Sequence, residues 1–428
     1  MFNKAWIHLA LILIPIALVF EVPALLVISA LLLTVVPVAW WWNQRSLSNV
    51  IYERILSERR AFPGEVVELT LRITNQKLLP LGWLSVEDRW SMALPLEGGT
   101  LFAAPAAVGR TGVFRSVFSI RWFERISRRF QVRCTRRGFY PFGPVRLGSG
   151  DIWGLFRHSV STEHLDWLVV YPQVLPLEAL GFSPKEPLGE TKATWRIFAD
   201  PSRAVGIRDH LPEDGFRHIH WKASARRQAL QVKVYEPTTS YNLVVFLNVA
   251  TFARHWEGTR PLLLEKAVAV AASIASHAVE ERYLVGLIAN GSIPHSDQPI
   301  KVLPSRRPDQ LARLLEALAA VTSFTTSTIE SLLLAESPRL PWGGTLVVVT
   351  AVVTEDLLTA LVRLRDVGRR LVLVSLEDDP SRSYSLPPEV LLHHLPASEL
   401  PFDEALLGEP GEWASDVAPP LRFAGGGE

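Results

Sequence analysis

The densest concentration of chemically capable side chains lies between Gly206 and Glu236. Two arginines with an aspartate between them could form a carboxylate-bridged loop, because a guanidinium offers a two-pronged donor to a carboxylate. Such a loop would hold the following tryptophan against the next domain; alternatively, the arginines could grip an acidic or phosphorylated ligand. The residues of this predicted structural or partner-binding signature are Arg208, Asp214, Arg217, Trp221 and Lys222.

Three histidines in the same segment allow an enzymatic alternative. His218 and His220 would share one face of a strand, and His210 lies nearby. Three imidazoles could hold zinc with an open fourth position, as in a zinc-dependent hydrolase. However, His210 lies across a turn from the other two, and no carboxylate-rich helix supplies a general base at a recognised spacing. We therefore predict a structural or partner-binding segment without a metal.

Composition and missing motifs narrow the function further. The 428 residues carry 44 Lys and Arg against 43 Asp and Glu, so the chain lacks the basic excess typical of general nucleic-acid binding. The single cysteine, Cys134, excludes an internal disulfide framework. A P-loop, a Gly-rich dinucleotide turn and a nucleophile elbow are all absent from the sequence. We predict a non-enzymatic protein without a cofactor.

Residues 1–42 form an apolar segment whose length suits two membrane spans. Between Ala5 and Trp42 the only ionisable side chains are His8 and Glu21. One helix of this length would be nearly twice as long as the roughly 30 Å hydrocarbon core, so a hairpin that turns at Phe20–Pro23 fits better. A secretory signal peptide is the alternative, but a second apolar run follows without a small-residue cleavage site.

Flanking charge gives the orientation of this hairpin. Lys4 precedes the first span, and the turn between the spans contains neither Lys nor Arg. The arginines that follow the second span are Arg45, Arg54, Arg59 and Arg60. The positive-inside rule therefore predicts a two-span cell-membrane protein whose soluble domains are cytoplasmic.

The soluble part divides into a β-rich and an α/β region. In residues 43–180, alternation such as Val67, Leu69, Leu71 and Ile73 predicts an immunoglobulin-like β-sandwich. Its Gly-, Pro- and aromatic-rich run, 136–156, is predicted to be a tightly turned strand pair, with a ligand platform as the alternative.

The second soluble region follows a connector at 181–240. Apolar strands such as Leu243–Leu247 alternate with amphipathic helices in residues 241–376, which predicts a doubly wound α/β domain. A Pro- and acid-rich tail occupies 377–428, with one short predicted helix at Leu386–Leu395. The predicted fold class is thus α/β plus β.

The order of several motifs resembles domain-of-unknown-function family fifty-eight. The signature residues are followed by ASAR and VKVYE, and upstream stand RRGFYPFGPVRL, DIWGLF and the dipeptide Tyr171-Pro172. The resemblance spans nearly the whole chain. It implies an N-terminal membrane hairpin, a C-terminal von Willebrand factor A-like domain and association with a MoxR-type AAA+ ATPase that assembles or activates complexes.

Domains of the von Willebrand type hold Mg²⁺ or Ca²⁺ through a DxSxS motif, a threonine and a later aspartate, because hard dications prefer oxygen ligands. Here the DxSxS positions read Asn248, Ala250 and Phe252, and the aspartate position reads Ala351. Other oxygens could come from Thr325, Thr326, Glu355 or Asp356. We predict no metal site, and a membrane-anchored scaffold or adaptor that binds proteins. The alternatives are the zinc-dependent hydrolase and a metal-dependent adhesion module.

Overall fold

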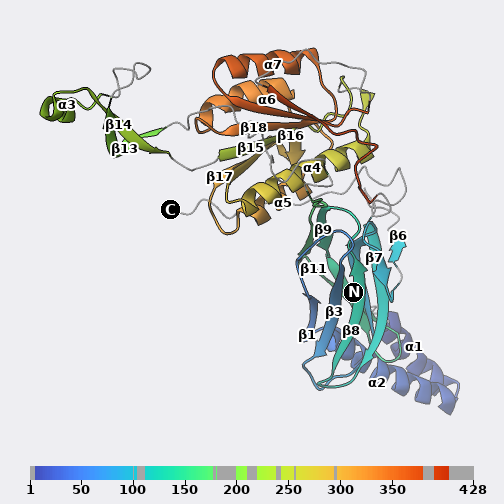
Figure 1. Ribbon diagram of the computed structural model, residues 1–428. Helices are drawn as coiled ribbons and strands as arrows, with labels where there is room; N and C mark the ends of the chain where they lie inside the picture. Colours follow the sequence, from blue (N-terminus) through green and yellow to red (C-terminus); the bar gives the residue numbers. More distant parts are fainter. Residues whose placement is uncertain are drawn as a thin grey trace. The chain divides into compact units, whose positions relative to one another are not determined.

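The structure is a computed structural model that describes residues 5–99, 101–103, 111–176, 180, 199–209, 219–237, 242–254, 257–293, 296–378 and 390–403. The chain divides into two compact units. The first contains Met1–Pro172 together with Asp403–Glu428, and the second is Gln173–Phe402 (Figure 1). The segment predicted to be a connector, 181–240, therefore falls within the second unit.

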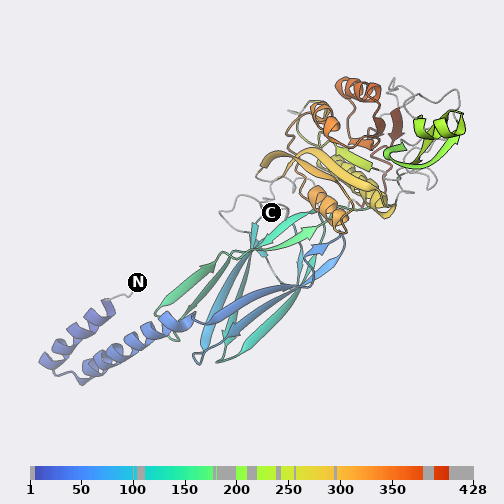
Figure 2. The same ribbon diagram turned by 90° about the vertical axis from the view of Figure 1, so that its left-hand side faces the viewer.

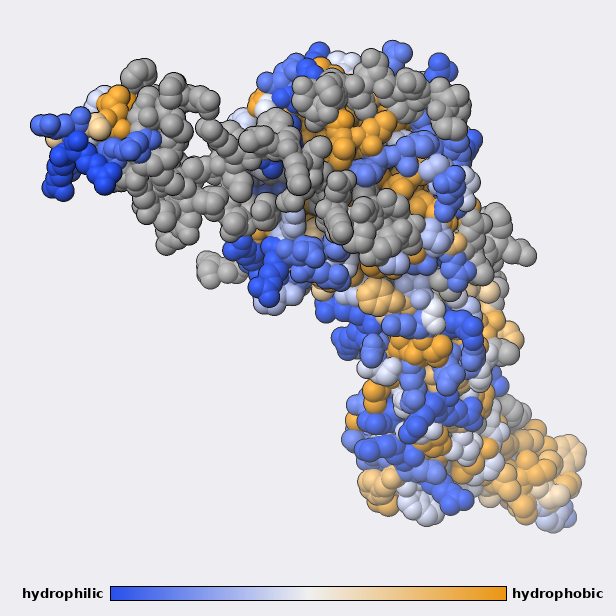
Figure 3. Space-filling view, in the orientation of Figure 1, coloured by the Kyte–Doolittle hydropathy of each residue, from blue (hydrophilic) through white to orange (hydrophobic). Residues whose placement is uncertain are grey.

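Two apolar helices begin the chain, α1 (Ala5–Val19) and α2 (Pro23–Ser46). The 24-residue α2 is long and apolar enough to cross a membrane, and only 17% of its most apolar window is buried. At 15 residues, α1 measures about 22 Å, which is shorter than the roughly 30 Å hydrocarbon core. Helix α4 (Pro261–Glu280) is also long and apolar enough to cross a membrane. However, 72% of its most apolar window is buried, as expected for a core helix. Figure 3 shows hydrophobic side chains gathered over α1 and α2.

A β-sandwich with a small third sheet follows α2, and its strands are mostly antiparallel. The inward positions of the strand Val66–Asn75, which are Val67, Leu69, Leu71 and Ile73, are at most 3% exposed, so the predicted alternation is confirmed. One sheet has the order β1 (Val50–Leu56), β3 (Val66–Asn75), β8 (Arg125–Arg133), β5 (Leu96–Glu97). The second has the order β11 (Arg157–Thr162), β10 (Val145–Gly150), β4 (Leu81–Ser91), β7 (Thr111–Ile120), β6 (Leu101–Ala103). The third has the order β2 (Arg60–Ala61), β12 (Asp166–Val170), β9 (Gly138–Phe142).

The run 136–156 departs from the predicted strand pair. Strand β9 pairs with β12, whereas β10 pairs with β4 and β11, so the two consecutive strands belong to different sheets. The chain changes sheets at Gly143, whose φ is 107°. A Cβ there would lie 2.6 Å from the His164 carbonyl oxygen and 2.8 Å from Arg54 Nη1. Only glycine satisfies both the backbone conformation and the close approach.

A buried charge network joins all three sheets of this unit. The Arg54 side chain of β1, 2% exposed, donates from Nη1 to Asp88 Oδ1 of β4 at 2.9 Å and from Nε to Asp166 Oδ2 of β12 at 2.9 Å. Tyr52 donates its hydroxyl to Asp88 Oδ2 at 2.7 Å. Burial raises the pKa of Asp88, and the Arg54 charge opposes that shift. The guanidinium is thus neutralised by two carboxylates within the protein.

The second unit contains a six-stranded sheet with the order β17-β16-β15-β18-β19-β20. Neighbouring strands are parallel except β16 and β17. Numbered within this sheet, the order is 3-2-1-4-5-6, so the predicted doubly wound topology is confirmed. The strands are β15 (Asn242–Leu247), β16 (Leu284–Ile293), β17 (Ser296–Ser305), β18 (Thr345–Thr350), β19 (Arg370–Ser375) and β20 (Val390–His394).

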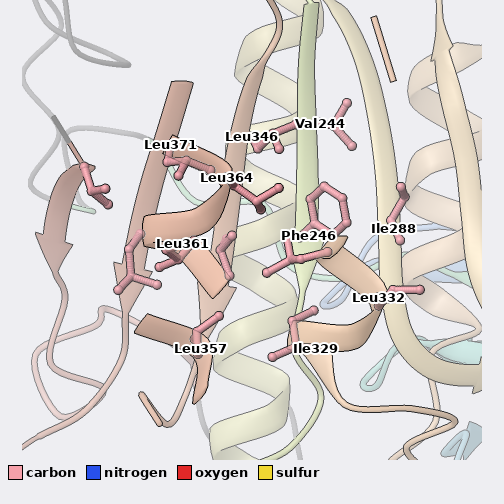
Figure 4. Close-up of a cluster of buried hydrophobic side chains, with 14 of the residues drawn as sticks. Val244, Phe246, Ile288, Ile329, Leu332, Leu346, Leu357, Leu361, Leu364 and Leu371 are labelled. Carbon is pink, nitrogen blue, oxygen red and sulfur yellow. The ribbon is translucent and has the colours of Figure 1, made fainter. Parts of the chain in front are cut away.

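Helices cover both faces of this sheet (Figures 1 and 2). One face packs against α4 and α5 (Gln310–Ala319). The other packs against α6 (Ile329–Glu336), which continues into the short η4 (Ser337–Arg339), and α7 (Glu355–Asp366). Phe246 and Val244 of β15 point into that second layer of leucines and isoleucines (Figure 4).

The end of the sheet corrects one prediction. Val390–His394, predicted to lie in a short helix, is the edge strand β20, which pairs in parallel with β19. The domain therefore extends past its predicted end at residue 376.

Replacing Asp88 with alanine should destabilise the β-sandwich, because the variant leaves the Arg54 guanidinium and the Tyr52 hydroxyl short of an acceptor in a buried site. We expect a loss of about 3 kcal/mol in the free energy of unfolding, measured as a lower thermal midpoint of the full chain in detergent. The matched control is Glu87→Ala on the same strand, whose ion pair with Arg115 is exposed and should be worth less than about 1 kcal/mol. Equal midpoints for the two variants would contradict the role assigned to Asp88.

Cys134 should be almost inert in the folded protein. Its side chain is 0% exposed, and burial, with the Glu65 charge as a smaller contribution, raises the pKa of its thiol from 9.0 to about 12. The reactive thiolate at pH 8 is therefore about a thousand-fold rarer than in the unfolded chain. We expect a maleimide to label the native chain at least a hundred-fold more slowly than the denatured chain. Rapid native labelling, comparable to that of an exposed Met92→Cys variant, would contradict this burial.

Candidate functional site

The carboxyl ends of β15 and β18 meet where the strand order reverses, which is where doubly wound sheets bind ligands. Three polar residues lie there. Asn248 follows β15, Asn290 lies within β16, and Thr350 ends β18. Their exposed fractions are 6%, 1% and 0%. A ligand bound in this position would have to compete with whatever these side chains already contact.

The three side chains contact one another and the local backbone. Asn248 Nδ2 donates to Thr350 Oγ1 at 3.0 Å, and Asn290 Nδ2 donates to Asn248 Oδ1 at 2.9 Å. Asn248 Oδ1 also accepts the Ala250 N–H at 3.1 Å, and Asn290 Oδ1 accepts the Val249 N–H at 2.8 Å. Thr350 Oγ1 donates to the Val352 carbonyl at 2.7 Å. We call these three residues the switch-point network; its groups are neutral and mutually satisfied.

Asn248 of this network is the residue that the resemblance aligned with the first ligand of a von Willebrand-type metal site. Asn248, the only DxSxS position with an oxygen ligand, already accepts two N–H donors through Oδ1. Thr326 donates its hydroxyl to the Asn290 carbonyl at 3.0 Å, and Thr325 is exposed. Ala351 is buried, whereas Glu355 and Asp356 are exposed in the first turn of α7. The donor set is thus poorly matched to a hard dication, which prefers charged oxygens.

The signature segment forms a separate arm built from β13 (Ala199–Asp209), α3 (Trp221–Arg227) and β14 (Gln231–Pro237). Strands β13 and β14 pair antiparallel in a two-stranded sheet (Figure 1). His220 caps α3, since its Nδ1 accepts the Ala223 N–H at 3.1 Å. Ser224 Oγ accepts the Gln231 N–H at 2.8 Å, which fixes the helix to β14.

The signature residues are distributed unevenly over this arm. Arg208 lies in β13 opposite Val232, while Asp214 and Arg217 lie outside the described residues, as do His210 and His218. Trp221 and Lys222 open α3 and are exposed, Trp221 at 65%. The prediction that Trp221 is packed against the next domain is therefore wrong.

Of the zinc-site residues, only His220 lies in the part that the structure describes, and its Nδ1 is engaged in the helix cap. Within the described ranges, His, Cys, Asp and Glu do not cluster in groups of three suited to a metal.

Sequence reasoning missed Asn290 and Thr350 of the network and Ser224 and Gln231 of the arm. A signal was available for the first two, because each interrupts an otherwise apolar buried strand, in YLVGLIAN and TLVVVT. A polar residue at such a position needs a hydrogen-bond partner nearby. The identity of that partner depends on strand order, which the motifs do not encode.

Comparisons with known proteins agree with part of the resemblance. Residues 206–393, from within β13 to within β20, match the family described as "Protein of unknown function DUF58". The Bacillus subtilis (strain 168) protein described as "Uncharacterized protein YeaD" is 26% identical over 354 residues, covering 80% of this chain and 79% of that protein.

Solved structures show only distant similarity. The CARDB domain of a Pyrococcus furiosus protein, solved with di-metal ions, is 11% identical over 28% of this chain and 91% of its own, with a TM-score of 0.18. A cohesin module from a Clostridium perfringens family 33 glycoside hydrolase is 10% identical over 28% of this chain and 95% of its own, with a TM-score of 0.20. The positive finding is thus that the arm and most of the doubly wound sheet match the DUF58 family.

Proposed function

We propose that this protein is a membrane-anchored, non-enzymatic adaptor whose second unit binds a protein partner. The observation that carries the proposal is the exposed Trp221 on α3. Tryptophan and arginine dominate the energetics of protein interfaces, and a ring left 65% exposed has apolar area to bury against a partner.

The arm holds Trp221 in a defined position. Cap and strand contacts fix α3 at its N-terminus, through His220 Nδ1, and at its middle, through the Ser224 hydroxyl. A prearranged anchor loses less conformational entropy on binding than a mobile one. The same helix carries exposed basic side chains, namely Lys222, Arg226 and Arg227. The complementary partner surface is therefore apolar at its centre and acidic at its rim.

We further propose, on the resemblance to domain-of-unknown-function family fifty-eight, that this partner is a MoxR-type AAA+ ATPase. We further propose that the second unit is a von Willebrand factor A-like domain without a metal. The 3-2-1-4-5-6 strand order supports this proposal, as does the neutral switch-point network. Helices α1 and α2 would anchor the chain as a two-span hairpin, with the soluble units in the cytoplasm.

Affinity capture of the full chain from native membranes tests the partner. We expect a MoxR-type ATPase to be recovered, and Trp221→Ala to reduce its recovery at least ten-fold, because the substitution removes the central apolar contact. The matched control is Phe324→Ala in the same unit, whose side chain is 72% exposed and lies outside the arm. Recovery of no ATPase above background would remove the partner proposal, and equal losses for both variants would remove the arm from it.

Metal titration separates the adaptor from its two alternatives. We expect Mg²⁺, Ca²⁺ and Zn²⁺ to leave the thermal midpoint of the purified chain unchanged, because the switch-point oxygens already accept hydrogen bonds. One zinc per chain, lost in a His218→Ala, His220→Ala variant, would instead support the hydrolase. A Mg²⁺-dependent rise in the midpoint would support the adhesion module.

A further inference from the structure

Three loops of the first unit carry large apolar side chains that are exposed to solvent. They are the β3–β4 loop, the β7–β8 turn and the β10–β11 loop. The six residues, which we call the apolar rim, are Leu78 (77% exposed), Trp122 (61%), Phe123 (64%), Ile152 (56%), Trp153 (50%) and Leu155 (38%). Exposed apolar groups that gather in one place mark an interaction surface.

Strand register places these loops at one end of the sandwich, the end at which α2 enters. Val50, the first residue of β1, pairs with Asn75 at the end of β3, and Leu81 at the start of β4 pairs with Ile120 at the end of β7. Ser149, near the end of β10, pairs with Leu84 of β4. Figure 2 shows the β-sandwich end and the helices meeting there.

Hydrogen bonds fix two of the loops to each other and to the chain that leaves α2. Phe123 N donates to the Lys77 carbonyl at 3.2 Å, and Lys77 Nζ donates to the Ser48 carbonyl at 2.8 Å. Asn75 Nδ2 donates to the carbonyls of both Leu79 and Arg121, at 3.0 and 2.9 Å. The exposed side chains therefore project from a braced backbone.

The third loop is held by one buried carboxylate. Asp151, 1% exposed, accepts the N–H groups of Trp153 and Leu155 at Oδ2 and of Phe156 at Oδ1. This turn directs Phe156 inward against Val36 and Ala39 of α2. The same turn leaves its remaining apolar side chains outside.

The length of α2 then determines what covers the rim. Phe156 of the sandwich packs against α2 at Val36 and Ala39, and the same face stays buried at Asn43 and Ser46; before it, Leu32 is partly buried and Ser29 is buried. The 13 residues before this face, Pro23–Val35, span only about 20 Å, whereas the hydrocarbon core is roughly 30 Å thick. If α2 crosses the bilayer, the sandwich end must reach into the lipid interface.

The side chains at this end suit that environment. Trp40 and Trp41 of α2 are 38% and 46% exposed and directly follow Ala39, which packs against Phe156 of the β10–β11 loop; tryptophan favours the membrane interface. Arg121, Arg125 and Arg157 flank the rim and are exposed, so they can meet lipid phosphates.

We propose that the apolar rim inserts into the phospholipid interface beside α2, so that the first unit is partly embedded in the bilayer surface. This inference rests on the proposed membrane anchoring and extends it from the helices to the β-sandwich. The rim would fix the tilt of the unit and complete the span that Pro23–Val35, the part of α2 before the contact with the sandwich, leaves short.

Depth-dependent quenching in vesicles tests the insertion. We introduce one cysteine at a time into the full chain, Trp122→Cys or Trp153→Cys, and label it with an environment-sensitive fluorophore. The labelled chain is reconstituted with lipids that carry a spin label near the headgroup. The native Cys134 is buried and stays unlabelled. Val27→Cys, 65% exposed in α2, reports on the anchor itself. Met92→Cys, 43% exposed, is the matched control, because it follows the far end of β4, about 33 Å away along the strand.

We expect lipid quenching at positions 122 and 153 and protection from aqueous iodide, while position 92 shows neither. Quenching at position 27 with positions 122 and 153 fully accessible to iodide would overturn the insertion and leave the anchor intact. Protection from iodide without lipid quenching would mean that protein covers the rim, which also overturns it. Absence of quenching at position 27 would sink the anchoring proposal itself.

Discussion

The first unit depends on neutralising one buried guanidinium. Arg54 enters the interior only four residues after β1 begins, and two carboxylates from two other sheets meet it there. Because an unpaired charge in that position would cost several kcal/mol, the three sheets cannot separate without exposing or stranding it. The Gly143 crossing exists for the same reason, since any side chain there would collide with Arg54.

In the second unit, buried polar groups are satisfied by neutral side chains and not by charges. A parallel sheet leaves polar backbone ends at its switch point, and ligands usually satisfy them. In this protein two asparagines and a threonine do so, with the acceptors filled from within. The arm instead exposes an aromatic ring, Trp221, and it is there that we propose a partner binds.

The features of the fold that depend on local periodicity could be predicted from the sequence. Alternation in β3 and apolar strands between amphipathic helices in the second unit gave the sandwich and the doubly wound sheet. Predictions that depended on distant pairing were wrong. The consecutive strands β9 and β10 join different sheets, and Val390–His394 is a strand because β19 offers a free edge, although its leucines favour helix.

The candidate site was predictable to a similar degree. Asn248 was identified because it follows a recognisable strand, but Asn290 and Thr350 become its neighbours only through the strand order. Trp221 was expected to pack against the next domain but is exposed, because the arm folds on itself through Ser224 and Gln231; its role in binding stays a prediction. The carboxylate-bridged loop expected for Asp214 and Arg217 stays a prediction, because both residues lie outside the described part of the chain.

The junction between α2 and β1 has a mechanical consequence. Only Leu47, Ser48 and Asn49 separate the helix from the strand, and two of them are hydrogen-bonded to the β3–β4 loop. Such a connection has almost no slack. A pull or torque applied to the sandwich would therefore be transmitted directly to α2, and with α2 in the bilayer as we propose, it would tilt or rotate the helix there.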